Sequence, residues 1–237
     1  MASSQTETEN CLPQKLFDGH VLSLIGKVDV IFVPRIISIV NGHNCCPRFG
    51  ALPDATRAGI ARGMPLISIE INETVIPLSK TLVKLAQTTL GADRKTARLA
   101  VRGAFEAMEQ HHREVAKQKQ EQQGERKFLL LGHPYSLHDH FIADPIIKKM
   151  NQLQVPVEVM SFAGENIRPS DILWCVFNKM YQKLEHLDTQ AYAGVIQIST
   201  FNCGADSMMV ERFRRLQTKR CTVYAAHGGR THGQGGT

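Results

Sequence analysis

The stretch KFLLLGHPY, residues 127–135, indicates the fold most plainly. Its first five residues are mainly apolar, and the apolar run ends at Gly132, which His133 and Pro134 follow. A short apolar run bounded by turn residues is typical of a strand buried on both faces, as in parallel sheets. We therefore predict a buried strand at 127–131 that ends in a turn, where Gly132 lets the backbone approach a ligand closely.

The same pattern recurs along the chain, where strand-like runs alternate with segments of helical period. Pro34 ends the run VDVIFV at 28–33, because proline has no N–H to donate to a ladder. Strands alternating with helices predict parallel pairing through right-handed crossovers, which is an α/β fold. The expected strands are 28–33, 66–71, 127–131, 155–160, 194–199 and 221–224, and the expected helices are 54–62, 77–90, 93–123, 144–152, 169–186 and 206–217.

The chain has 237 residues, which allows one large domain or two small ones. The polar end of the long helix expected at 93–123 marks the boundary. We predict a first α/β subdomain at 11–123, which includes this connecting helix, and a second at 124–225. The polar residues 1–10 are expected to be disordered, and the Gly- and His-rich residues 226–237 to form a flexible tail.

Composition and missing motifs exclude several classes of function. No apolar run reaches the roughly 18 residues of a membrane span, and no secretory signal begins the chain, so we expect a cytoplasmic protein with no membrane partner. The net charge is +6, but Lys and Arg are spread through the expected helices and aromatic residues make up only 6%, so we expect no nucleic-acid partner. Walker A, G-x-G-x-x-G and G-x-S-x-G motifs are all absent.

Cysteines are the candidate chemical groups. An intracellular chain keeps its thiols reduced, and here no C-x-x-C pair gives a metal signature. Cys203 follows the strand expected at 194–199 and opens a helix, where the positive helix end lowers a thiol pKa and favours thiolate. Against this, free cysteine is often simply part of the core, which is how we interpret Cys175 and Cys221. Asp206 and Ser207 are at least as well explained as helix caps.

Two adjacent cysteines lie in the loop after the first strand. Pro47 makes Cys46 extended rather than helical, as a ligand in an irregular loop would be. Adjacent residues in an extended chain point opposite ways, so one of Cys45 and Cys46 is expected to bind and the other to pack. Cys11 also lies within two residues of a proline, in the first ordered turn.

The carboxyl ends of the expected strands nominate three ligand-binding loops: 34–48, 132–140 and 200–207. In the second, we expect Gly132, His133, Pro134 and Tyr135 to form a ligand-contacting turn. A mononuclear metal held by His133, His138, His140 and Asp144 is an alternative, but no H-E-x-x-H or similar spacing supports it.

Five segments together resemble the acyl-CoA dehydratase activase-related proteins, which are relatives of the cluster-binding subunits of 2-hydroxyacyl-CoA dehydratases. They are CLPQKLFDGHV, VDVIFVPRIISI, CPRFGALPD, LLLGHPYSLHDHFI and FNCGADSMMVERF, spanning residues 11 to about 217. The resemblance implies two Rossmann-like subdomains with mainly parallel sheets. The first is expected to be truncated at its N-terminus, because only ten polar residues precede Cys11.

The resemblance also implies a cofactor, a [4Fe–4S] cluster held by Cys11, Cys46 and Cys203 with Cys45 as the alternative to Cys46. The fourth iron is then open to water or substrate, and Arg35 and Arg48 are candidates to set the electrostatics. Thiolates are the usual ligands of such clusters.

The implied function is that of an iron–sulfur protein that passes or receives single electrons. It would be a component of an acyl-CoA dehydratase-type lyase or of an ATP-dependent reductase system. The implied partners are an ATP-dependent activator protein and an acyl-CoA substrate. The alternative is a cluster-free α/β binding or scaffold domain, a truncated family member without activity.

Overall fold

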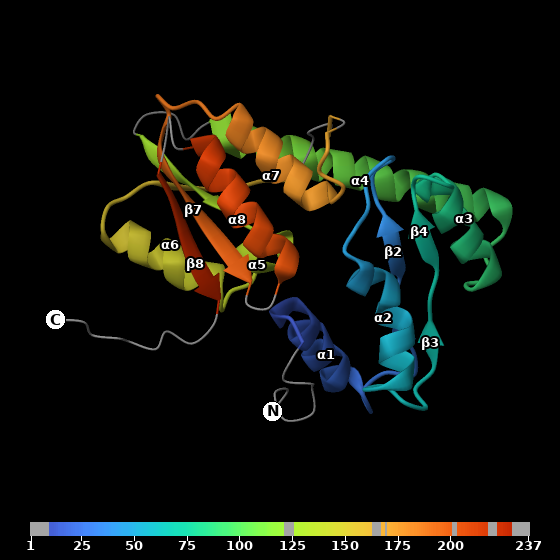
Figure 1. Ribbon diagram of the computed structural model, residues 1–237. Coiled ribbons are helices and arrows are strands. Elements are labelled where there is room, and N and C mark those ends of the chain that lie inside the picture. Colours follow the sequence, from blue (N-terminus) through green and yellow to red (C-terminus); the bar gives the residue numbers. More distant parts are fainter. Residues whose placement is uncertain are drawn as a thin grey trace. The chain divides into compact units, whose positions relative to one another are not determined.

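A computed structural model describes residues 10–120, 126–162, 167–168, 170–200, 203–217 and 222–228, without the side chains of 116–120, 217 and 222–228. It confirms an α/β fold, because every pairing between its named strands is parallel. The chain divides into two compact units (Figure 1). Unit 1 comprises Gln14–Gln123 and Phe162–Lys179, and unit 2 comprises Thr8–Pro13, Gly124–Ser161 and Met180–Thr237.

Unit 2 is built on a four-stranded parallel sheet with the order β6-β5-β7-β8. The strands are β5 (Lys127–Leu131), β6 (Val157–Val159), β7 (Tyr192–Thr200) and β8 (Thr222–Gly228). Its helices are α5 (Pro134–Leu137), α6 (Ala143–Gln152), α8 (Gly204–Gln217) and the C-terminal part of α7 (Cys175–Glu185). Leu129, Leu130 and Leu131 are fully buried, which confirms the strand predicted at 127–131.

The order of the strands creates a switch point in this sheet. The chain adds β6 on one side of β5 and then returns to the other side for β7 and β8. Right-handed crossovers therefore place α6 and α8 on opposite faces, and Figure 1 shows α8 in front of β7 and β8 with α6 behind them. The carboxyl ends of β5 and β7 flank the switch point, where doubly wound sheets bind their ligands.

Unit 1 is built around two short parallel pairs of strands and four helices. Its strands are β1 (Ile31–Phe32), β2 (Arg35–Ser38), β3 (Leu66–Ile67) and β4 (Glu70–Asn72), paired β1–β3 and β2–β4. Its helices are α1 (Leu12–Leu24), from Gln14 onward, α2 (Pro47–Ala58), α3 (Leu78–Thr88) and α4 (Arg94–Gln120). A small core joins α1, β1 and the turn after α2 through Val21, Ile31, Val33 and Ala61.

The strands of unit 1 are shorter than the sequence predicts. The strand expected at 28–33 is paired as β1 only at Ile31–Phe32, and the Phe32 side chain is 51% exposed. The strand expected at 66–71 is split into β3 and β4. Pro34 does not end the hydrogen bonding, contrary to expectation: the Val33 and Arg35 amides on either side of it donate to the Ile67 and Ile69 carbonyls, both at 2.9 Å. Pro34 takes the alternate position between these two donors, so its missing N–H costs no bond to β3 or β4.

Several other element boundaries also differ from expectation. Helix α2 begins at Pro47 rather than at 54, because proline at the first helical position gives up an N–H that has no helical partner. Helix α7 begins at Cys175 rather than at 169, and α8 begins two residues early. Strand β8 runs to Gly228, into the segment expected to be a tail. Residues 1–9, Cys221 and 229–237 lie outside the described residues.

In the part of the chain that the structure describes, no helix combines the length and the apolar character needed to cross a bilayer.

The register of β5 and β7 depends on one glycine. Phe128 lies opposite Gly194, and a Cβ at Gly194 would lie 2.5 Å from Cε1 of the Phe128 ring. Gly194→Ala should therefore lower the free energy of unfolding by about 1–3 kcal/mol, the usual effect of overpacking, measured by urea denaturation. Gly103→Ala is the control, because that glycine lies within α4 with nothing near it, and it should stabilise by about 1 kcal/mol. Equal stability of the two variants would contradict this account of the register.

Candidate functional site

The candidate site lies at the carboxyl ends of β5 and β7 in unit 2. After β5, Gly132 is buried, and a Cβ there would lie 3.3 Å from Cβ of Ile198 on β7. The glycine therefore permits close packing of the neighbouring strand. His133 directly precedes α5, and Pro134 occupies the first turn of that helix. After β7, Cys203 directly precedes α8.

A buried histidine–aspartate pair joins the two strand ends. His133 Nε2 lies 3.1 Å from Asp206 Oδ1, and the two side chains are 11% and 1% exposed. The other carboxylate oxygen, Oδ2, accepts hydrogen bonds from the backbone N–H of Thr200, at 2.8 Å, and from its hydroxyl. Asp206 thus closes the turn between β7 and α8 and ties it to the loop after β5.

Two effects oppose each other at the Asp206 carboxylate. Burial acts to raise the pKa of Asp206, because it penalises the charged form. Hydrogen bonds and charge from His133, together with the hydrogen bonds from Thr200, favour that form and hold the pKa below its usual value. Asp206 is therefore a buried anion that these two residues stabilise.

Cys203 is held against the same helix end. The backbone N–H of Asp206 donates to Cys203 Sγ at 3.4 Å, and Ser207 Oγ donates to the Cys203 carbonyl at 3.1 Å. One ligand atom each from His133, Cys203 and Asp206 lies within 4.8 Å of the others. Imidazole, thiolate and carboxylate are all ligands of transition metals, so this group, within the described residues, has the chemistry of a metal site.

The two remaining histidines of the loop are arranged differently. Across the described residues, neither His138 nor His140 joins the group of possible metal ligands around His133. His140 Nδ1 instead lies 2.9 Å from Asp144 Oδ2, and the His140 side chain is 88% exposed. The alternative metal set of the sequence analysis is therefore not assembled around His133.

Tyr135 links the loop after β5 to the end of β7. Its ring stacks on His133, with centroids 4.8 Å apart, and its hydroxyl lies 3.3 Å from Thr200 Oγ1. Burial raises the pKa of Tyr135, the hydrogen bond with Thr200 opposes this, and the charges of Asp206, Cys203 and Cys11 raise it further. Tyr135 is therefore a neutral phenol at neutral pH.

Cys11 belongs to unit 2 together with Leu12 and Pro13, whereas α1 from Gln14 onward belongs to unit 1. It is buried and directly precedes α1. Unit 2 thus contains two of the three expected cluster ligands, while Cys46 belongs to unit 1.

In unit 1, the loop with Cys45 and Cys46 is pinned by backbone hydrogen bonds. The Cys45 amide donates to the Ile37 carbonyl at 2.8 Å, the Asn44 amide to the Leu173 carbonyl at 2.9 Å, and the Cys175 amide to the Asn44 carbonyl at 3.1 Å. Cys46 is exposed and occupies the N-cap position of α2.

A polar network in the same unit was not predicted. The Asn178 amide group is buried and donates to His43 Nε2 at 2.8 Å, while Ser170 Oγ donates to Asn178 Oδ1 at 2.8 Å. Asn178 and His43 are 135 residues apart in the chain, so no local pattern in the sequence indicates their contact.

The two adjacent thiols differ in their electrostatics. Burial raises the pKa of Cys45 to about 11, the charges of Cys175 and Cys46 add to this effect, and a backbone hydrogen bond at Ile39 opposes it. Cys45 is thus a neutral, packed thiol at neutral pH. Burial also raises the pKa of Cys175, which is 4% exposed, in agreement with its expected place in the core.

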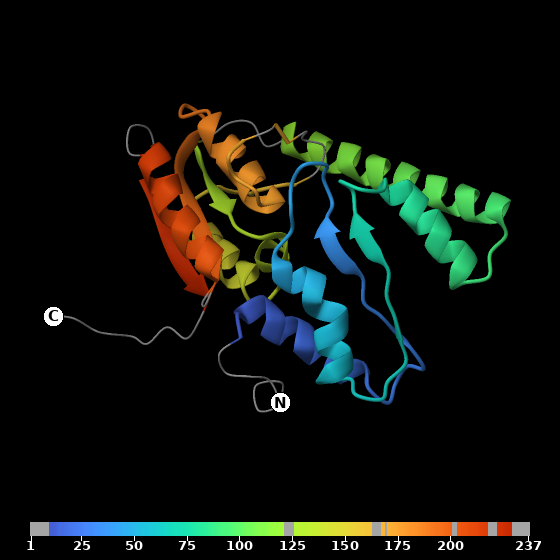
Figure 2. The same ribbon diagram turned by 45° about the vertical axis from the view of Figure 1, so that its right-hand side comes forward.

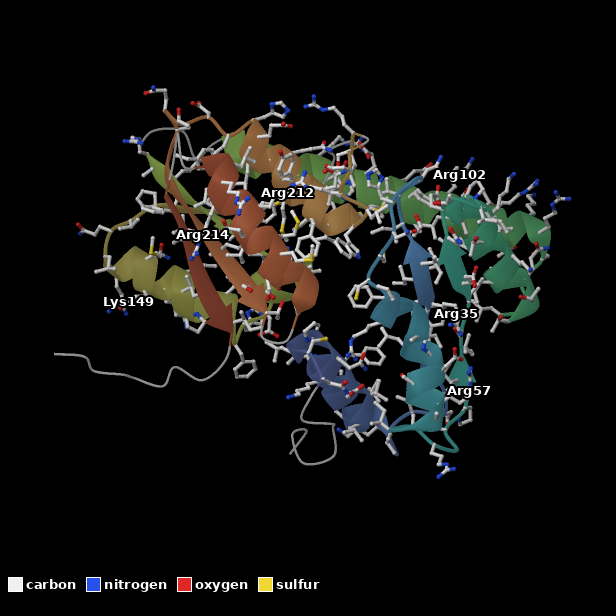
Figure 3. The ribbon with its side chains drawn as sticks, viewed as in Figure 1. Arg35, Arg57, Arg102, Lys149, Arg212 and Arg214 are labelled. Atoms are coloured by element: carbon white, nitrogen blue, oxygen red, sulfur yellow. The ribbon has the colours of Figure 1, made fainter. Side chains whose placement is uncertain are left out.

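Arg35 is bound by α2. It donates to the Gly50 carbonyl at 2.5 Å and pairs with Asp54 at 2.5 Å, and Arg57 reaches the same carboxylate at 3.2 Å (Figure 3). The hydrogen bond from Arg35 is the main reason that the pKa of Asp54 lies below its usual value. Arg35 therefore ties β2 to α2.

Sequence reasoning nominated both loops of the site but missed the pair that joins them. Asp206 was explained as a helix cap, and His133 as a separate ligand-contacting residue. Knowing that β5 pairs with β7 would have predicted the contact between His133 and Asp206. Neighbouring parallel strands end at the same edge of a sheet, so the loops that follow them lie close together.

Comparison with known families gives one match. The family described as CoA enzyme activase uncharacterised domain (DUF2229) matches residues 1–162, which is more than half of the chain. The match includes Cys11, Cys46 and the loop after β5, and it ends before Cys203. No curated protein and no solved structure matches the chain.

The lowered pKa of Asp206 predicts how stability depends on pH. A carboxylate with a depressed folded-state pKa stabilises the fold above its unfolded pKa of about 3.9, and this contribution is lost as the pH falls through the folded-state value. Asp206→Asn should cost about 1–3 kcal/mol at pH 7, and the gap to the parent protein should shrink below about pH 4. Urea denaturation at several pH values measures the gap, and a gap that stays constant from pH 7 to pH 3 would contradict the assignment.

The thiols of the adjacent cysteines should react at different rates. Because the thiolate is the nucleophile, Cys45 should be alkylated by iodoacetamide at pH 8 at least about tenfold more slowly than Cys46. Cys45→Ser and Cys46→Ser are the matched variants, and mass spectrometry of the peptide over time measures the labelling. The rapid phase should persist in Cys45→Ser and disappear in Cys46→Ser. Rapid labelling of Cys45 in Cys46→Ser would refute the prediction.

Proposed function

The chain belongs to the family of CoA enzyme activase uncharacterised domains, and from this premise we propose that it binds a [4Fe–4S] cluster and passes or receives single electrons. The proposed ligands are Cys11, Cys46 and Cys203. One observation carries the proposal: each of these cysteines is the residue directly before a helix, α1, α2 and α8 respectively.

Helix N-termini suit both a thiolate and an anionic cluster. The first turn of a helix leaves backbone N–H groups without helical partners and carries a partial positive charge. Both features stabilise negative charge on a sulfur at that position. The N–H of Asp206 already makes such a contact with Cys203 Sγ. Burial instead raises the pKa of Cys45 and Cys175; Cys45 lies one residue further from α2, and Cys175 is the buried first residue of α7.

The donor set of unit 2 fits such a cofactor. Cys11 and Cys203 both belong to unit 2, the compact unit that also contains Tyr135. When bound, a cluster held by three cysteines supplies a one-electron centre and an iron without a protein sulfur, which is a Lewis acid. Tyr135, as a neutral phenol, offers a hydrogen bond in this unit. His133 and Thr200 hold the Asp206 turn, and with it Cys203, in place.

The family description also bears on the partners. It associates the chain with activases of CoA enzymes. We propose that the chain exchanges electrons with an ATP-dependent activator protein and that an acyl-CoA is the substrate of the system. The activator would supply the ATP hydrolysis, since this sequence holds no Walker A motif.

Iron and sulfide analysis tests the proposal. The full chain, purified without oxygen and reconstituted with ferrous iron and sulfide, should contain about four irons and show a cubane signal by electron paramagnetic resonance after reduction. Cys11→Ser, Cys46→Ser and Cys203→Ser should each lower the iron content and alter the spectrum. Cys45→Ser and Cys175→Ser are the matched controls and should retain the iron.

The serine variants also separate the alternatives. Loss of iron in Cys45→Ser with retention in Cys46→Ser would exchange the roles of these two residues. Iron-free parent protein, or full iron content in the three ligand variants, would overturn the proposal. The chain would then be an α/β binding domain without a cluster.

A further inference from the structure

A basic groove lies between α3 and α4 of unit 1, and no cysteine lines it. The two helices run side by side in Figures 1 and 2. The groove has a volume of about 740 Å³, within the range of roughly 300–1,000 Å³ that small-molecule sites occupy. We name it the α3–α4 groove, and its lining residues are Ser79, Lys80, Val83, Lys84, Gln87, Arg94, Arg98, Val101, Arg102 and Phe105.

The charge of the groove has one sign. Five of its ten lining residues are Lys or Arg and none is acidic. Lys80 and Lys84 are four residues apart on α3, as are Arg94, Arg98 and Arg102 on α4, and like charges at this spacing destabilise a helix. Local stability therefore does not account for this arrangement. The pairing of the helices gathers charges that seemed dispersed in the sequence.

Further along α4 the charges alternate and pair. Glu109 and Arg113 lie 3.8 Å apart, and Glu106 reaches Arg102, at the rim of the groove, at 3.7 Å (Figure 3). The C-terminal half of α4 thus carries both acidic and basic side chains, whereas the charged residues with which α4 lines the groove are all arginines. Such segregation is what an anionic ligand requires, since phosphate groups bind clustered Lys and Arg.

The groove also has an apolar part. Val83, Val101 and Phe105 are half-buried among the cations. An aromatic ring can stack on a nucleobase, and arginine can add to that stacking. A ligand that matches the groove thus combines several negative charges with one flat ring.

We propose that the α3–α4 groove binds a nucleoside diphosphate, the chemistry shared by ADP and the nucleotide half of coenzyme A. The diphosphate pairs with the Lys and Arg side chains, and the base lies on the Val83, Val101 and Phe105 side chains. The proposal does not depend on a cluster, because every residue of the groove belongs to α3 and α4. Iron-free protein should bind the nucleotide as well.

Isothermal titration calorimetry of the full chain tests the proposal, with ADP, coenzyme A, adenosine and pyrophosphate as probes. ADP or coenzyme A should bind. Adenosine, which has no phosphate, and pyrophosphate, which has no base, should each bind at least about tenfold more weakly. Lys84→Glu/Arg98→Glu should weaken nucleotide binding at least about tenfold. Lys95→Glu/Arg113→Glu makes the same change of charge on α4 outside the groove and should leave binding unchanged.

Further variants and probes test the base-binding part of the groove and the source of the nucleotide. Phe105→Ala should weaken ADP about tenfold and leave pyrophosphate unchanged. Coenzyme A binding more tightly than ADP would identify coenzyme A as the source of the nucleotide, and the reverse would identify a free nucleotide. Absence of binding by both, equal binding to the groove variant and its control, or tighter binding of a single-stranded oligonucleotide would overturn the proposal.

Discussion

The parallel pairing of β5 with β7 is the constraint on which the candidate site depends. Leu129, Leu130 and Val195 are fully buried in it, so the register is held by packing on both faces of the sheet. Because paired parallel strands end at the same edge, this register brings the loop after β5 to the loop after β7. His133 and Asp206 meet there although 73 residues separate them in the chain.

The sequence predicted those parts of the fold that burial dictates. Strand β5 was predicted within its observed bounds because its leucines are fully buried, and fully buried strands have the continuous apolar pattern that marks them. Unit 1 was predicted less well, since the equally apolar run at 28–33 is paired only at Ile31–Phe32 and the side chains of Val30 and Phe32 are 42% and 51% exposed. An apolar run indicates that a strand can form. The length of the neighbouring strand, here β3, decides how many residues of the run are paired.

The site was predicted in its parts but not in its connections. The rule that ligands bind at strand ends pointed to both loops, because it needs only strand boundaries. The bond between His133 and Asp206 depends on which strands are neighbours, and the α3–α4 groove depends on how two helices pair; neither is local in the sequence. Asp206 also illustrates how one residue can satisfy two explanations, since it lies in the first turn of α8 and receives a hydrogen bond from β5's loop.

The five cysteines that the structure describes fall into two classes, and local structure separates them. Cys45 and Cys175 are packed thiols whose neutral form burial favours. Cys11, Cys46 and Cys203 each come directly before a helix, although their exposure ranges from buried to exposed. Exposure alone therefore would not group these three. What they share is the position directly before the first helical residue, whereas Cys175 is itself the first residue of α7 and is buried. A residue that precedes a helix can face the free N–H groups of its first turn, and this is the property that the proposed cluster ligands have in common.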